Sequence, residues 1–269
     1  MSAEINRPPV NITTLQRMKA QGEKIACLTC YDASFTRVLE DAGIDVFIVG
    51  DSLGMVLKGH ESTVAVTMKD MIYHAANVAR SGRLALRIVD LPFMSYATRE
   101  QALANAARLM REGGGHMVKL EGGSVVAGVV EHLARHAIPV CGHIGLQPQS
   151  VHALGGYRVQ GRDAAGAAVL ADARALEAAG ASLLVIECVP AELAARVGAA
   201  VTIPVIGIGA GPACDGQVLV LYDMLGITPG KRPRFVRDFL GQAGSVPAAI
   251  AAYVRAVRDG SFPGPEHCF

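Results

Sequence analysis

Four short apolar runs in the sequence each end on an acidic residue, namely Asp51, Asp90, Glu121 and Glu187. Runs of this length that are rich in Val, Ile and Leu are typical of buried parallel strands. Because the carboxyl ends of such strands meet at one rim of an α/β fold, we expect these acids to gather there. Carboxylates packed together repel one another unless a cation or a shifted pKa compensates them. The pattern therefore predicts a carboxylate-lined site that binds a metal ion.

Asp51, Asp90 and Glu121 form the predicted metal site. Carboxylate ligands favour a hard cation such as Mg²⁺, which leaves coordination positions for substrate oxygens. The alternative is that each acid caps the helix that follows its strand, which is a common role. The residues after Asp51 and Asp90 are not typical of a helix start, so we favour metal binding.

Three further residues near the same strand ends could act on a substrate. Lys119 lies two positions before Glu121, so both side chains face the same way on a strand. Lys119 would meet a substrate anion or, alternatively, pair with one of the acids. Glu187 ends a very apolar run, which should raise its pKa toward that of a general base; the alternative is a hydrogen-bond acceptor behind the site. His143 could donate a hydrogen bond to a substrate or serve as a structural histidine.

The apolar runs predict eight strands, at residues 25–30, 46–50, 84–89, 117–120, 139–143, 183–187, 204–208 and 218–222. Helical patterns separate most of them, including a first helix opened at Thr13-Thr14-Leu15-Gln16 and closed by Gly22, two capped at Thr67 and Thr98, one over 164–179, and a mostly helical tail over 234–259. The alternation predicts a (β/α)8 TIM barrel that comprises residues 1–269 as a single domain. The extra N-terminal helix could plug the bottom of the barrel. A doubly wound open sheet is the alternative.

The composition argues against several classes of protein. A formal net charge of +1 argues against a nucleic-acid partner. No apolar run is long enough to cross a membrane, and the first residues lack the apolar core of a signal peptide, so we expect a cytoplasmic protein. The six cysteines fit reduced thiols, and Cys27 and Cys30 would face opposite sides of a strand as small buried residues. With 51% hydrophobic and 18% charged residues, the chain is apolar enough to suggest an oligomer interface.

Several motifs, in order over nearly the whole chain, resemble those of the ketopantoate hydroxymethyltransferase family. They are Val49-Gly50-Asp51-Ser52-Leu53-Gly54-Met55, Gly59-His60-Glu61-Ser62-Thr63, Asp90-Leu91-Pro92-Phe93-Met94, Met117-Val118-Lys119-Leu120-Glu121-Gly122-Gly123, Pro139-Val140-Cys141-Gly142-His143-Ile144-Gly145-Leu146, Gly155-Gly156-Tyr157-Arg158-Val159-Gln160-Gly161-Arg162, Glu187-Cys188-Val189-Pro190, Ile206-Gly207-Ile208-Gly209-Ala210-Gly211 and Phe262-Pro263-Gly264. Any one of these motifs alone would be weak, but together they are specific.

The resemblance implies a (β/α)8 barrel with one Mg²⁺ per subunit and a homo-oligomer, often a decamer. It implies transfer of a hydroxymethyl group from 5,10-methylenetetrahydrofolate to 3-methyl-2-oxobutanoate, which forms 2-dehydropantoate in the first committed step of pantothenate and coenzyme A biosynthesis. By motif, the metal site is Asp51, Asp90 and Glu121, the ketoacid contacts are Asp51, Ser52, Asp90 and Lys119, with His143 a further candidate, and the proton acceptor is Glu187.

The resemblance also predicts a mechanism, in which Glu187 removes the C3 proton of the ketoacid and Mg²⁺ stabilises the enolate. Lys119 and His143 would add positive charge or a hydrogen-bond donor near the enolate oxygen. Two alternatives stay open. One is a related Mg²⁺-dependent barrel enzyme that acts on 2-oxo acids, such as a carbon–carbon lyase. The other is a non-catalytic barrel that binds a ketoacid.

Overall fold

The apolar runs of the sequence form a closed parallel barrel. The computed structural model describes residues 7–269, and within them eight strands pair in sequence order, with β1 also paired to β8. This closure confirms the predicted (β/α)8 barrel and excludes the open sheet. The strands are β1 Ile25–Thr29, β2 Val46–Val49, β3 Leu86–Asp90, β4 Met117–Glu121, β5 Val140–Gly145, β6 Leu183–Glu187, β7 Val205–Ile208 and β8 Gly216–Leu219.

Each strand is buried on both of its faces, which explains why the sequence shows continuous apolar runs instead of alternation. In β2, Val46 and Ile48 belong to a core inside the barrel, whereas Phe47 and Val49 belong to a second core between the strands and the helices. The same alternation separates Cys27, which lies inside the barrel, from Cys30, which lies outside it. The expectation that these two cysteines face opposite sides is confirmed.

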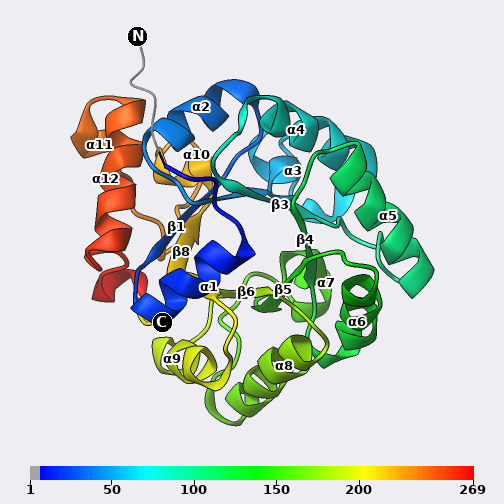
Figure 1. Ribbon diagram of the computed structural model, residues 1–269. Helices are drawn as coiled ribbons and strands as arrows, with labels where there is room; N and C mark the ends of the chain where they lie inside the picture. The colour runs from blue at the N-terminus through cyan, green and yellow to red at the C-terminus, as the bar shows by residue number, and fades with distance from the viewer. Residues whose placement is uncertain (1–6) are drawn as a thin grey trace.

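Helices form a ring around the barrel, from α2 through α5, α8 and α9 to α12 (Figure 1). The α-helices are α1 Ile12–Gln21, α2 Ala33–Asp41, α3 Leu53–Val56, α4 Met68–Ser81, α5 Arg99–Arg111, α6 Ala127–Arg135, α7 Val151–Leu154, α8 Gly166–Ala178, α9 Ala191–Ala200, α10 Leu221–Met224, α11 Leu240–Ala243 and α12 Val246–Arg258. Short 3-10 helices are η1 Thr63–Ala65, η2 Ser124–Val126, η3 Pro148–Ser150, η4 Asp163–Ala165 and η5 Pro265–His267. The predicted caps of α4 and α5 at Thr67 and Thr98 are confirmed.

Helix α1 closes the end of the barrel where the strands begin, as expected (Figure 1). Its Leu15 and Met18 pack into the core inside the barrel. The Lys19 ammonium donates to the backbone carbonyls of Gly198, Val201 and Ile203, which precede β7. Closure of this end leaves the opposite rim, where the strands end, as the place for a site.

Most boundaries differ from the sequence-based expectation by one to three residues, and two of these differences have a clear physical reason. The first helix is capped by Asn11, two residues before the predicted start, because the Asn11 carboxamide accepts the Thr14 backbone N–H at 2.9 Å. Strand β8 ends at Leu219, whereas we predicted residues 218–222. The apolar run there continues beyond the strand into helix α10, so composition alone does not mark the end of the strand.

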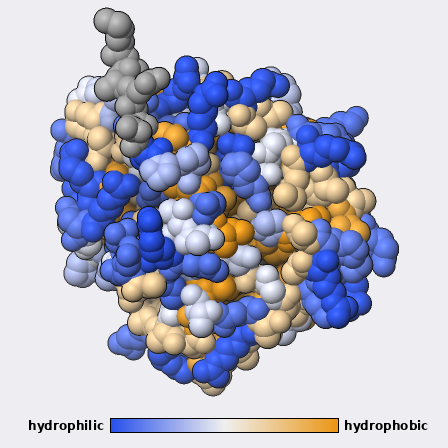
Figure 2. All heavy atoms as spheres, viewed as in Figure 1, coloured by the Kyte–Doolittle hydropathy of each residue, from blue (hydrophilic) through white to orange (hydrophobic). Residues whose placement is uncertain are grey.

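The outer surface carries a mixture of residue types. On the face viewed in Figure 2, hydrophobic residues lie in separate patches among hydrophilic ones. No helix within residues 7–269 has both the length and the apolar character needed to span a bilayer. The first six residues, part of the segment in which we predicted no signal peptide, lie outside the described part of the chain.

Candidate active site

The two-residue periodicity of the strands directs a set of polar side chains into the barrel. In β3, Leu86 and Ile88 lie in the core inside the barrel, so Asp90, two residues later, faces the same interior. By the same argument, Lys119 and Glu121 follow Met117 into the interior. In each of these strands, polar residues occupy the last positions that face the interior, beyond the apolar core.

His143 and Glu187 reach the interior in the same way, from β5 and β6. Strand register then brings the polar residues together across strands. It pairs Asp90 with Lys119 and Glu121 with His143. The structure thus gathers the acids and bases that the sequence predicted for this rim.

Asp51 joins this group from the turn after β2. Its backbone N–H donates to Asp90 Oδ2 at 3.1 Å, which brings the two residues into contact. The expectation that no helix starts here was wrong, because the four-residue helix α3 begins at Leu53 directly after Ser52. Asp51 is not the N-cap of this helix, and the Asp51 carboxylate accepts a hydrogen bond from the Gln149 side chain in η3 instead. The Ser52 hydroxyl lies 2.9 Å from the Tyr31 hydroxyl.

Lys119 forms a buried ion pair with Asp90. The Lys119 ammonium lies 3.0 Å from Asp90 Oδ2, and the two side chains are only 6% and 3% exposed. Burial alone would lower the pKa of Lys119, but the negative charges of Asp90, Glu121 and Asp51 outweigh it and raise that pKa. Lys119 therefore carries a positive charge, and the ion pair that we considered as its alternative role is present.

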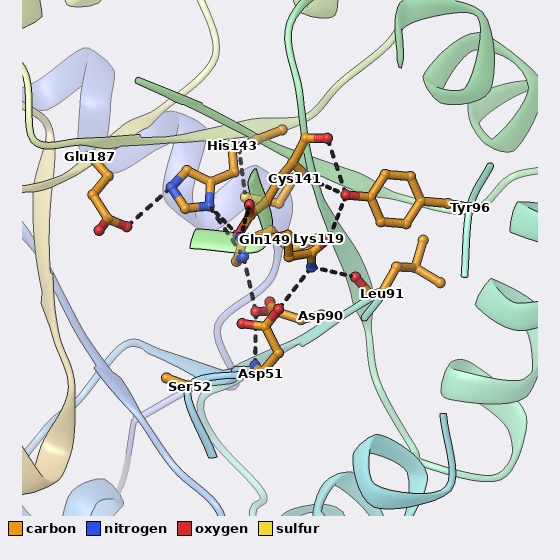
Figure 3. Close-up of polar contacts among 12 residues, drawn as sticks. Asp51, Ser52, Asp90, Leu91, Tyr96, Lys119, Cys141, His143, Gln149 and Glu187 are labelled. Atoms are coloured by element: carbon orange, nitrogen blue, oxygen red, sulfur yellow. Dashed lines mark hydrogen bonds and ion pairs between the residues drawn. The ribbon is translucent and has the colours of Figure 1, made fainter. Parts of the chain in front are cut away.

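His143 lies between two carboxylates from different strands. Its Nδ1 is 3.5 Å from Glu121 Oε1, and its Nε2 is 3.3 Å from Glu187 Oε2 (Figure 3). Burial and the Lys119 charge lower the pKa of His143, yet the contacts with Glu121 and Glu187 raise it to about 9. The Nε2 contact lacks hydrogen-bond alignment, and Nε2 has no hydrogen-bond partner in the described range 7–269. Glu187 is more exposed than its neighbours, at 13% of its side chain.

Two residues that the sequence analysis missed complete the network, Tyr96 and Gln149. The Gln149 side-chain amide donates to Asp51 Oδ2 at 2.8 Å, and the Gln149 backbone N–H donates to Glu121 Oε2 at 2.9 Å. The Tyr96 hydroxyl donates to Gln149 Oε1 at 2.6 Å. Tyr96 lies in the turn after β3 and Gln149 lies in η3 after β5, where strand periodicity gives no signal. The one available signal was the position of Gln149 in the loop that follows the strand of His143.

The charges in this cluster are not balanced. Asp51, Asp90, Glu121 and Lys119 are all at least 95% buried, so three carboxylates surround one ammonium group. Burial and the carboxylates of Asp90 and Glu121 raise the pKa of Asp51 well above its usual range. Asp90 Oδ1 and Glu121 Oε1 have no hydrogen-bond partner among residues 7–269. A buried cluster of this kind needs further positive charge.

The donor set fits a hard divalent cation. It consists of carboxylate oxygens, two of which are buried and have no hydrogen-bond partner within residues 7–269. Within residues 7–269, however, no three His, Cys, Asp or Glu side chains are grouped as a ready-made metal site. The direct ligation of one ion by Asp51, Asp90 and Glu121 therefore stays a prediction.

Comparison with known sequences gives matches over nearly the whole chain. The sequence model described as ketopantoate hydroxymethyltransferase matches residues 9–265. A relative from Alkalilimnicola ehrlichii named 3-methyl-2-oxobutanoate hydroxymethyltransferase is 59% identical, over 98% of this chain and 95% of its own length. A relative of the same name from Burkholderia multivorans is 57% identical, over 99% of this chain and 98% of its own length.

Comparison with solved structures finds the same fold in more distant proteins. Oxaloacetate acetylhydrolase has a TM-score of 0.61 and 16% identity, with 95% of this chain and 100% of that chain covered. The 2,3-dimethylmalate lyase, described as a PEP mutase/isocitrate lyase superfamily member, has a TM-score of 0.57 and 18% identity, with 94% and 91% covered. At these identities the likeness establishes the fold alone.

The buried and exposed lysine–aspartate pairs of this chain should differ in their effect on stability. We expect Lys119→Met to lower the free energy of unfolding by about 3–5 kcal/mol, because it leaves Asp90 buried and uncompensated. Lys58→Met breaks a pair of similar length, 2.9 Å, whose side chains are 34% and 24% exposed. It should cost at most about 1 kcal/mol. Urea unfolding in EDTA measures both, and equal losses would contradict the electrostatic account.

Proposed function

The chain belongs to the ketopantoate hydroxymethyltransferase family, and we propose that it transfers a hydroxymethyl group from 5,10-methylenetetrahydrofolate to 3-methyl-2-oxobutanoate. The product would be 2-dehydropantoate, in the first committed step of pantothenate biosynthesis. The observation that carries the proposal is the buried cluster of three carboxylates and Lys119 at the rim where the strands end. Such a cluster suits a substrate that offers a carboxylate and a 2-oxo group to a shared cation.

We propose that Asp51 and Asp90 hold a divalent cation such as Mg²⁺, with Glu121 close by. With all three buried carboxyl groups ionised, the one ammonium group leaves two negative charges, which is the charge that one divalent cation would neutralise. The Glu187 carboxylate and a protonated His143 carry opposite charges, so including both leaves the net charge of the cluster unchanged. When bound, the cation would polarise the 2-oxo group of the ketoacid and so acidify C3.

The residues of the chain itself divide the remaining work. Lys119 carries a fixed positive charge beside Asp90, and it would stabilise the negative charge that develops on the 2-oxo oxygen. Ser52, next to Asp51, offers a hydroxyl to the ketoacid. The strands and helix α1 exclude water from the interior below the site, which strengthens these electrostatic interactions.

Glu187 is the proposed general base for the C3 proton. Its carboxylate lies at the edge of the cluster, more exposed than the other acids, so a substrate seated over Asp51 and Asp90 could reach it. His143 Nε2 lies 3.3 Å from the Glu187 carboxylate, where a protonated His143 would attract it electrostatically. The C3 carbanion would then attack the methylene carbon of the folate as one of the two C–N bonds of that carbon breaks. Replacement of the second nitrogen by water would give the hydroxymethyl product and tetrahydrofolate. The expectations of a cytoplasmic location and a homo-oligomer, by family resemblance a decamer, stay predictions.

An assay with both substrates separates this function from the two alternatives. With 3-methyl-2-oxobutanoate and 5,10-methylenetetrahydrofolate, we expect 2-dehydropantoate to form, and we expect EDTA to abolish its formation until Mg²⁺ is restored. Formation or cleavage of carbon–carbon bonds in the ketoacid without folate would favour a lyase. Binding of the ketoacid with no C3 proton exchange at saturating Mg²⁺ would favour a non-catalytic binding protein.

Removal of the base should slow the exchange of the C3 proton with solvent much more than it weakens substrate binding. We expect Glu187→Gln to lower the rate of C3 deuterium exchange in D₂O by a factor of about 10²–10⁴, a typical general-base contribution. Glu192→Gln is the matched control, because Glu192 is an exposed carboxylate in the first turn of the next helix. Near-normal exchange in Glu187→Gln would assign the proton transfer to another group.

A further inference from the structure

Gln149 is a buried amide whose hydrogen-bonding groups all have partners. Its residue is only 4% exposed. The side-chain nitrogen donates to Asp51 Oδ2 at 2.8 Å and to the Leu91 carbonyl at 3.0 Å, and the side-chain oxygen accepts from Tyr96 (Figure 3). A buried amide with three aligned partners has a single favourable orientation.

Tyr96 fixes the orientation of this amide. Its hydroxyl oxygen accepts the backbone N–H of Glu121 at 3.3 Å. The hydroxyl has two acceptors, the Glu121 carbonyl at 3.2 Å and Gln149 Oε1 at 2.6 Å, and its proton is directed to the nearer one, Gln149 Oε1. Because the Tyr96 hydroxyl donates to the amide oxygen, the amide nitrogen must face Asp51 and Leu91. Reversal of the amide would place its oxygen against the Asp51 carboxylate, where two acceptors would repel.

Gln149 therefore contacts two acids that come from different strands. Its side chain binds one oxygen of Asp51, after β2, and its backbone N–H binds Glu121 Oε2, at the end of β4. The other oxygen of Glu121, Oε1, remains buried without a hydrogen-bond partner among residues 7–269. The contacts of Gln149 thus use one oxygen of each acid, and the Glu121 Oε1 atom keeps only the 3.5 Å contact with His143 Nδ1 and accepts no hydrogen bond within residues 7–269.

We propose that Gln149 and Tyr96 are positioning residues, which hold the Asp51 and Glu121 carboxylates at one fixed separation around the proposed cation. This inference rests on the proposed function and deepens it, because it names residues that set the metal affinity without touching the reacting atoms. A neutral amide suits this task better than a second lysine would. It satisfies a carboxylate oxygen but adds no positive charge that would compete with the cation for Asp51.

The test compares two buried glutamines of the same barrel. Gln149→Met removes the amide next to Asp51. Gln217→Met is the matched control, because Gln217 is also 4% exposed and its amide donates to the Gly211 carbonyl at 3.0 Å. The first readout is the dissociation constant of Mn²⁺, which binds the same oxygen ligands as Mg²⁺. It is measured in the presence of 3-methyl-2-oxobutanoate from the electron paramagnetic resonance signal of free Mn²⁺. The second is the free energy of unfolding in EDTA.

We expect Gln149→Met to weaken Mn²⁺ binding by about 10- to 100-fold, the usual effect of removing a group that orients metal ligands. Gln217→Met should bind Mn²⁺ as the unaltered chain does. Tyr96→Phe should weaken binding less than Gln149→Met. The double variant should be no weaker than Gln149→Met alone, since the other contact of Tyr96 is with the Glu121 backbone and its effect on the carboxylates passes through the amide. Loss of unfolding free energy in EDTA with unchanged Mn²⁺ affinity would mean a purely structural role and would overturn the proposal.

A failure of the proposed function would be visible separately. If the unaltered chain binds no Mn²⁺, the proposed metal site is wrong before any variant is compared. The positioning role is then judged on C3 proton exchange of the ketoacid. Exchange in Gln149→Met at the unaltered rate, or no more affected than in Gln217→Met, would overturn it as well.

Discussion

The burial of several carboxylates at one end of the barrel is the constraint on which the rest of the site depends. Asp51, Asp90 and Glu121 lie where water cannot solvate their charges, and the ammonium group of Lys119 lies among them. Burial, together with repulsion from Asp90 and Glu121, raises the pKa of Asp51. Hydrogen bonds from Gln149 and the contact with His143 relieve part of this repulsion without neutralising it. A divalent cation and an anionic ketoacid would complete this charge distribution, which links the geometry to the proposed chemistry.

The barrel makes such a cluster possible because, below the cluster, both faces of each strand pack against apolar residues. Val46, Ile88 and Val185 lie inside the barrel, and Leu15 from α1 packs against the same core. This apolar interior and the second core outside the strands hold the strand ends rigidly. The inward positions beyond the core can therefore be polar, since the apolar residues beneath them supply the stability. A fold of this kind separates the residues that maintain the barrel from those that could act on a substrate.

Much of this arrangement could be predicted from the sequence, because it follows from strand periodicity. The two-residue period of a strand is enough to predict that Lys119 and Glu121 face the same side. The same period predicts that Cys27 and Cys30 face opposite sides. Strand boundaries were less predictable, as β8 shows, because its apolar run continues into a helix. Tyr96 and Gln149 could not be found, since loop residues reach the site through tertiary packing and carry no periodic signal.

The most direct test of the account is a crystal structure of the protein with Mn²⁺ and 3-methyl-2-oxobutanoate, in which anomalous scattering locates the metal. The account predicts one ion per chain, at about 2.1 Å from carboxylate oxygens of Asp51 and Asp90 and in contact with the ketoacid. Glu121 should lie beside the ion, and the C3 atom of the ketoacid should face Glu187. An ion bound elsewhere, or a ketoacid bound at this rim with no metal between it and the carboxylates, would contradict the account.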